Sequence, residues 1–242
     1  MIYEIAGMRV QIQNRCKYTE KFCEKYLSQD QDSPFDISAS VTNEEFFAEK
    51  QATPNNFSDG YIENICLYRA ICRQLPTFDR MLLHAAVIKY DGKAYAFLGK
   101  SGTGKSTHTG LWNQYLKGVS VVNGDKPILQ YVNDGFLAYG TPWMGKENLG
   151  ENTVAPLCGL CFLEQAKENE IVKLTPMQAA NRIFTQVLFP QDAQNAEKTL
   201  ELLDKLVTVV PAYLLKCTIS QEAVQKSFEA LTGNQFVKNN EV

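Results

Sequence analysis

The eight-residue run from Gly99 to Ser106, GKSGTGKS, constrains the fold of this chain more than any other segment. It fits the pattern G-x-x-x-x-G-K-[ST], in which glycines let backbone N–H groups turn inward around phosphate oxygens. The apolar segment before it predicts a strand. The segment from about Lys105 to Leu116 predicts a helix whose positive N-terminal end faces the same turn. The sequence therefore predicts a strand, a phosphate-binding turn and a helix, in that order.

The residue types in this glycine turn (Gly99–Ser106) match the needs of a nucleotide. Lys105 is expected to reach the β- and γ-phosphates, and the hydroxyl of Ser106 is expected to bind Mg²⁺. The expected cofactors are therefore ATP and Mg. A plain glycine turn is the competing interpretation, and the strand and helix on either side disfavour it. The expected nucleotide-binding residues are Gly99, Lys100, Ser101, Gly102, Thr103, Gly104, Lys105, Ser106 and Thr107.

Two residues outside the turn are candidates for the chemistry. Asp125 follows the apolar segment VSVVNG, so it lies at the end of a predicted buried strand, where a carboxylate can hold Mg²⁺. His84 lies on a predicted strand, LLHAAVIKY, that a hairpin at Asp91-Gly92 brings beside the strand leading to Gly99. A His at that place can approach the γ-phosphate region. The sequence leaves open whether His84 is instead a core residue and Asp125 a surface turn residue.

A glycine-rich loop at 140–152, GTPWMGKENLGEN, follows a strand that should end near the site. Trp143 and Lys146 are candidates to stack on a substrate and to neutralise phosphate. A core position for Trp143 with a solvated Lys146 is equally open. The loop is expected to be mobile when the site is empty. His108 is expected to be structural, and Arg182 to be a surface charge.

The turns predict the overall architecture. Asp91-Gly92 and Asn133-Asp134-Gly135 each read as a hairpin, so antiparallel pairs must flank the glycine turn, and the sheet must be mixed. Residues 1–78 are expected to form a small N-terminal α+β subdomain with a connecting helix. Residues 79–242 are expected to form the core that carries the site.

Within residues 1–78 the signals are weaker. The segment 3–13 alternates apolar and polar residues, as one half-buried strand does. Helical spacing begins after Ser58 or Asp59, either of which can cap the helix, and ends before Pro76.

Composition excludes several functional classes. The chain has 242 residues and a net charge of −3, which argues against a protein held to nucleic acid by phosphate contacts and against a polybasic membrane patch. No apolar run reaches the roughly 18 residues of a membrane span. The first residues do not read as a signal peptide and the seven cysteines lack framework spacing, so a cytoplasmic protein with reduced thiols is expected. The oligomeric state is open, a homo-oligomer included.

The segment LLHAAVIKYDGKAYAFLGKSGTGKS resembles the core of HPr kinase/phosphorylase and its smaller kinase relatives. Their pattern is a His on one strand, a hairpin and then G-x-S-G-x-G-K-S, and the spacing from His84 to Gly99 fits it. The segment VVNGD is similar to the family's strand that ends in two aspartates. The same architecture occurs in phosphoenolpyruvate carboxykinase. The resemblance spans about residues 80–232, and residues 1–78 do not resemble the usual N-terminal domain of HPr kinase.

This resemblance implies an α/β fold with a mixed-sheet phosphoenolpyruvate carboxykinase-like P-loop core. It also implies ATP, Mg²⁺ and phosphoryl transfer to a hydroxyl, mainly of serine, on a small molecule, peptide or protein. Gly124 stands where the family has the first aspartate, and Thr107 where HPr kinases carry Glu. Asp125 maps onto the second aspartate, and His84 becomes the candidate that accepts the hydroxyl proton. The implied catalytic residues are therefore His84, Lys105 and Asp125. A nucleotide-binding regulatory or assembly protein with little turnover is the alternative, which Gly124 favours.

Overall fold

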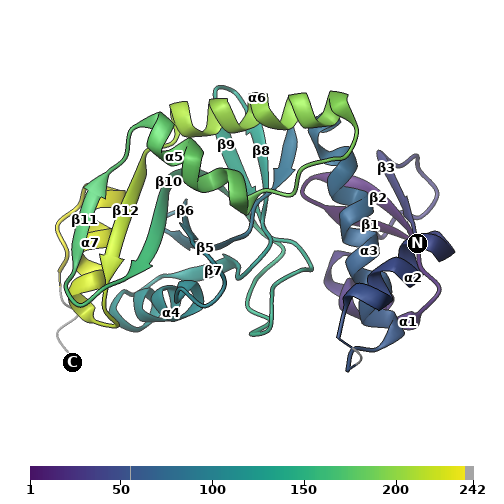
Figure 1. Cartoon of the computed structure of the whole chain (residues 1–242), viewed down its shortest axis with the longest axis horizontal. Helices are drawn as coiled ribbons and strands as arrows, with labels where there is room; N and C mark the ends of the chain where they lie inside the picture. Colours follow the sequence, from purple (N-terminus) through teal and green to yellow (C-terminus); the bar gives the residue numbers. More distant parts are fainter. Residues whose placement is uncertain (55, 238–242) are drawn as a thin grey trace.

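The chain folds into a mixed α/β structure with two β-sheets (Figure 1). It is described here from a computed structural model that places residues 1–54 and 56–237. Within those ranges one sheet has three strands and the other has nine. No helix in the described ranges is both long and apolar enough to cross a membrane.

The small sheet is built from the N-terminal residues in the order β1-β2-β3, with α3 packed against it. Its strands are β1 (Ile2–Ile5), β2 (Met8–Gln13) and β3 (Ile37–Ser40). The helices of this part are α1 (Lys17–Phe22), α2 (Asn43–Ala52) and α3 (Asp59–Gln74), with 3-10 turns at Glu24–Tyr26 and Leu75–Phe78.

The expectation of one strand over residues 3–13 is wrong, because the segment is a hairpin. Ala6 and Gly7 form its turn, with φ angles of 53° and 71°. An alanine rarely adopts positive φ, so the turn carried a weak sequence signal. The start of α3 is confirmed, since the hydroxyl of Ser58 accepts a hydrogen bond from the backbone N–H of Tyr61 at 3.2 Å.

The large sheet runs in the order β4-β8-β9-β10-β6-β5-β7, with β12 paired to β10 and β11 paired to β12. The pairs β6–β10 and β10–β12 are parallel, and the others are antiparallel, so the prediction of a mixed sheet is confirmed. The strands are β4 (Arg80–Leu82), β5 (Ala85–Tyr90), β6 (Lys93–Leu98), β7 (Ser120–Asn123), β8 (Ile128–Val132), β9 (Gly135–Tyr139), β10 (Val154–Gln165), β11 (Glu170–Lys173) and β12 (Ala212–Cys217).

Helices cover both faces of this sheet. Alternate residues of β6 show it: Ala94, Ala96 and Leu98 pack in the cluster that holds α5 and α6, and Tyr95 and Phe97 pack in the cluster that holds α4 and α7. The helices are α4 (Lys105–Tyr115), α5 (Pro176–Ile183), α6 (Ala193–Val209) and α7 (Gln221–Thr232). After Ile183, α5 continues into a 3-10 turn, Phe184–Gln186.

Apolar contacts join the N-terminal residues to the rest of the chain. Leu82, Ile128, Trp143 and Met144 pack in the same cluster as the small sheet and α3. The subdomain boundary at residue 78, and the finer assignment of a phosphoenolpyruvate carboxykinase-like core, stay predictions.

Candidate functional site

The glycine turn lies between β6 and α4, as expected. Gly99, Gly102 and Gly104 have φ angles of 153°, 83° and 102°, in a region that other residues rarely adopt. A Cβ atom on Gly99 would lie 2.6 Å from the hydroxyl oxygen of Thr103, which itself donates a hydrogen bond to the carbonyl of Lys100 at 2.8 Å. The closed form of the turn therefore depends on glycine at its first position.

The start of α4 is open to an anion. Gly104 is its N-cap and offers no side-chain hydrogen bond, so the first N–H groups of the helix face the turn. Lys105 is buried at this point, and its ammonium donates to the carbonyl of Gly99 at 2.9 Å. Burial lowers the pKa of Lys105, and the nearby charge of Asp125 partly offsets that effect. The ammonium of a lysine has three N–H donors, so besides its bond to Gly99 it can also bind phosphate oxygens.

Asp125 lies between two basic side chains. One of its carboxylate oxygens lies 3.1 Å from Nε2 of His84, and the other bonds the ammonium of Lys126. Burial alone would raise the pKa of Asp125, but the hydrogen bonds from His84 and Lys126 outweigh burial and lower it to about 2. Asp125 is therefore a carboxylate at neutral pH.

A break in a strand places His84 beside Asp125. The expected continuous strand LLHAAVIKY is divided, because β4 pairs with β8 whereas β5 pairs with β6 and β7. His84 lies in the gap, where its N–H donates to the carbonyl of Gln186 at 2.7 Å. The next residue, Ala85, donates to the carbonyl of Asp125 at 3.1 Å. His84 is thus a half-exposed pocket residue and not part of the core.

Asn123 orients Asp125 and the residue after it. Its buried side-chain oxygen accepts from the backbone N–H groups of Asp125 at 2.9 Å and Lys126 at 2.6 Å. Its side-chain nitrogen donates to Thr141, to the carbonyl at 3.1 Å and the hydroxyl at 3.0 Å. An Asn ahead of a Gly-Asp pair is the sequence signal for such a turn.

The loop at 140–152 is anchored at both ends. The N–H of Gly124 donates to the carbonyl of Leu149 at 2.9 Å, and the N–H of Gly140 donates to the carbonyl of Thr153 at 2.9 Å. A Cβ atom on Gly124 would meet two loop carbonyls, those of Met144 at 2.8 Å and Leu149 at 3.1 Å. Gly124 therefore has a packing role, since it lets the loop lie against the end of β7.

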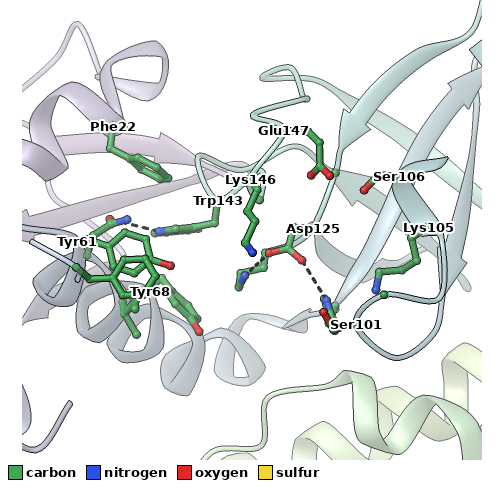
Figure 2. A pocket seen from close by; sticks show the side chains of 18 of the residues that line it. Phe22, Tyr61, Tyr68, Ser101, Lys105, Ser106, Asp125, Trp143, Lys146 and Glu147 are labelled. Atoms are coloured by element: carbon green, nitrogen blue, oxygen red, sulfur yellow. Dashed lines mark hydrogen bonds and ion pairs between the residues drawn. The ribbon is translucent and has the colours of Figure 1, made fainter. Parts of the chain in front are cut away.

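Trp143 takes the core position that the sequence left open. It is 4% exposed, its Nε1 donates to the side-chain oxygen of Asn64 at 3.4 Å, and its ring lies 5.8 Å from that of Tyr68. It can form a wall of the site but not a free stacking surface. Lys146 is exposed, and Figure 2 shows its side chain pointing into the pocket beside Asp125.

A pocket of about 820 Å³ brings most of the predicted site together. Gly99, Lys100 and Thr103 belong to the turn but do not line the pocket. Its far wall is aromatic and was not predicted. From the predicted set, the pocket is lined by His84, Ser101, Gly102, Gly104, Lys105, Ser106, Thr107, Asp125, Trp143 and Lys146.

The residues present fit a magnesium–nucleotide complex. Mg²⁺ commonly takes one or two protein oxygens and completes its shell with phosphate and water. The Ser106 hydroxyl and the Asp125 carboxylate line the same pocket and supply that number. Among the described residues no group of three His, Cys, Asp or Glu side chains could hold a metal by itself.

Comparison with known proteins decides the family. A family model described as "SynChlorMet cassette protein ScmC" matches residues 55–229. The chain belongs to the ScmC family. No curated protein matches it. A solved structure, the Hpr(Ser) kinase/phosphatase from Coxiella burnetii, is similar over 50% of this chain and 93% of that chain, at 13% identity and a TM-score of 0.29. A TM-score this low assigns neither an activity nor a ligand to the ScmC chain.

The ScmC match contains every predicted site residue, from His84 to Lys146, and it starts just before α3. It leaves out α1, which contributes to the far wall of the pocket. Two other predictions concern residues outside the pocket. His108 is 3% exposed and packs on Phe97, and Arg182 pairs with Glu164 at 2.6 Å at the surface.

Proposed function

We propose that this ScmC-family protein is an ATP- and Mg²⁺-dependent kinase that transfers the γ-phosphoryl group to a serine-type hydroxyl on a small molecule, peptide or protein. One observation carries the proposal: a glycine turn with a buried lysine opens into the same pocket as a His–Asp pair. The glycine turn and its lysine hold phosphate, and the His–Asp pair accepts a proton. Phosphoryl transfer to a hydroxyl needs both functions.

The glycine turn and α4 hold the donor. The first N–H groups of the helix and the ammonium of Lys105 bind phosphate oxygens and fix the chain of phosphates along the turn. Ser106 and Asp125 would hold Mg²⁺, which would supply positive charge to neutralise the phosphates. Lys146, on the loop opposite, adds a second cation that reaches the pocket from solvent.

His84 acts on the acceptor. Its Nε2–H donates to Asp125, so a neutral ring keeps a lone pair on Nδ1. Nδ1 takes the proton of the acceptor hydroxyl as that oxygen bonds to the γ-phosphorus and the bond to the ADP oxygen breaks. The carboxylate of Asp125 stabilises the imidazolium that results, as it does in other His–Asp pairs.

A second candidate function is a nucleotide-binding regulator or assembly protein with little turnover. Gly124 favours it, because this chain lacks the first of the two aspartates in the resembling kinases. The two candidates share nucleotide binding and differ in acceptor-dependent transfer.

Nucleotide binding is tested with Lys105→Ala. Loss of the buried ammonium should weaken binding of a non-hydrolysable ATP analogue with Mg²⁺ by about 1.5–3 kcal/mol, the value of hydrogen bonds to a charged group. Isothermal calorimetry measures it. Lys117→Ala is the matched control, because it removes an exposed lysine beyond the other end of α4. Equal affinity of the wild type and Lys105→Ala would contradict the proposal.

A further inference from the structure

Four aromatic side chains form a continuous surface on the pocket wall that faces the glycine turn. The rings of Tyr18 and Phe22 stack at 5.7 Å, and those of Phe57 and Tyr61 stack at 4.5 Å. Tyr18 and Tyr61 join the two pairs edge to face at 6.4 Å. We call Tyr18, Phe22, Phe57 and Tyr61 the aromatic platform. All four line the pocket.

The platform lies beyond the His–Asp pair as seen from the turn. Figure 2 shows Phe22, Tyr61 and Tyr68 on one side of Asp125, with Lys105 and Ser106 on the other. Lys126 lies between Asp125 and the aromatic side of the pocket, because its ammonium bonds Asp125 and lies 5.6 Å from the centre of the Tyr68 ring. The order through the pocket is therefore the phosphate turn, the His–Asp pair and the aromatic platform.

Two buried features hold the platform in one piece although it comes from separate segments. A Cβ atom on Gly60 would lie 2.4 Å from Cβ of Tyr18, so glycine there lets α1 pack directly on α3. Glu63 is 1% exposed and accepts from the N–H groups of Arg15 at 2.7 Å and Cys16 at 2.9 Å, at the start of α1. The buried Glu63 carboxylate fixes the start of α1 against α3. This indicates that the shape of the aromatic platform matters.

The outer rings are not needed by the core. Tyr18 is 38% exposed and Phe57 is 39% exposed, and neither they nor Tyr61 belong to a hydrophobic cluster of the described residues. The platform thus runs from the enclosed pocket out to its rim. A ligand confined to the pocket floor would leave these rings in water, whereas an extended chain would cover them.

We propose that the aromatic platform binds the acceptor, and that the acceptor is a peptide segment with an aromatic or aliphatic side chain next to its hydroxyl residue. This inference rests on the proposed function. The acceptor hydroxyl must reach His84 from the side opposite the phosphates, and that side is the platform. A flat aromatic surface binds a neighbouring ring or aliphatic side chain by stacking and apolar contact.

Binding of three peptides tests the inference: acetyl-Gly-X-Ser-X-Gly-amide with X as Phe, Leu or Gly. Calorimetry without nucleotide should show that the wild type binds the Phe and Leu peptides at least about tenfold more tightly than the Gly peptide. Tyr61→Ala and Phe57→Ala should each weaken binding of the Phe peptide by about three- to tenfold, the range for an aromatic pair. Phe47→Ala is the control, since that ring is 59% exposed outside the pocket and should change nothing.

Other results would overturn the inference. One is equal binding of the three peptides. Another is a Tyr61→Ala variant that loses affinity for ATP but not for tripolyphosphate, because the platform would then hold the nucleotide base. Failure of the proposed function is separate: a wild type that binds no ATP analogue contradicts the kinase, whereas peptide binding is measured without nucleotide.

Discussion

At the scale of single residues, the site depends on which partners the carboxylate of Asp125 contacts. Its two oxygens contact His84 and Lys126, and the lone pairs that remain on each oxygen are available to a metal. The sequence assigned metal binding to Asp125 and proton transfer to His84 as separate roles. Their contact at 3.1 Å couples the two proposed roles, because the carboxylate proposed to bind Mg²⁺ also contacts the imidazole.

His84→Ala should separate transfer from binding. Affinity for the ATP analogue should stay nearly unchanged, and the rate of transfer should fall by about 10²–10⁴-fold, the usual contribution of a positioned acid–base group. Asp125→Asn, by contrast, should impair both Mg²⁺-dependent binding and transfer. Calorimetry and single-turnover rates on the same preparations measure the two effects. Full transfer by His84→Ala would show that the base lies elsewhere.

His108 should make stability depend on pH. Ser227 donates its hydrogen to the carbonyl of Val224, so its oxygen accepts from Trp112 and from Nε2–H of a neutral His108. Burial lowers the pKa of His108 from 6.5 to about 4. The unfolded chain therefore binds the proton first as pH falls, and stability declines from pH 6.5 to pH 4, by about 3 kcal/mol at most.

Denaturant unfolding at several pH values measures this decline. The control is His108→Gln, which keeps a donor near Ser227 but has no group that titrates in this range. The account predicts a flatter pH profile for His108→Gln than for the wild type between pH 4 and pH 6.5. If the stability of the wild type and of His108→Gln depended on pH in parallel, other titratable groups would be the cause.

At the scale of elements, the loop at 140–152 is held to the sheet at several points, and its mobility in the empty site stays a prediction. Its glycines and lack of periodicity predicted a loop that is mobile when empty. Backbone hydrogen bonds to Val122, Gly124 and Thr153 hold both ends, and Trp143 is buried, so the exposed residues are those at 145–149 together with Glu151 and Asn152. The sequence could not show this, because Val122 and Gly124 are distant from the loop in the chain.

Gly124→Asp should therefore damage the site and not restore a missing carboxylate. The new Cβ would press on the carbonyls of Met144 and Leu149, and overpacking of this kind costs about 1–3 kcal/mol of stability. Gly110→Ala is the matched control, since nothing lies within 4 Å of its Cβ and it lies on the exposed side of α4. Thermal unfolding compares the two. A Gly124→Asp variant as stable as the wild type, with higher transfer, would favour the missing aspartate as the limit on activity.

At the scale of the whole molecule, the sequence predicted what is local and missed what is distant. The strand–turn–helix around Lys105 and the mixed sheet follow from glycines and hairpin turns that lie within a few residues of what they shape. The break at His84 depends on pairing with Gln186, and the aromatic platform depends on α1 packing against α3. No periodic pattern in residues 1–78 predicts that α1 packs against α3.

The two lobes in Figure 1 therefore have to be considered together. The lobe with the large sheet holds the glycine turn, and the N-terminal lobe supplies the platform across the pocket. Residues of both pack in one apolar cluster, so the pocket they share is part of the fold itself. The proposed kinase needs a donor site and an acceptor site on either side of one proton acceptor, and residues of the two lobes line opposite walls of one pocket.

The central claim is that the protein is a kinase, and transfer of label from γ-³²P-ATP to the Phe peptide, acetyl-Gly-Phe-Ser-Phe-Gly-amide, tests it most directly. The wild type with Mg²⁺ should place label on the serine hydroxyl, as located by fragment mass spectrometry. Lys105→Ala and His84→Ala should place far less label, and Lys117→Ala should match the wild type. Label that stays on ATP or appears as free phosphate alone, with the peptide and with serine or cell-extract acceptors, would contradict a kinase and favour the nucleotide-binding regulator.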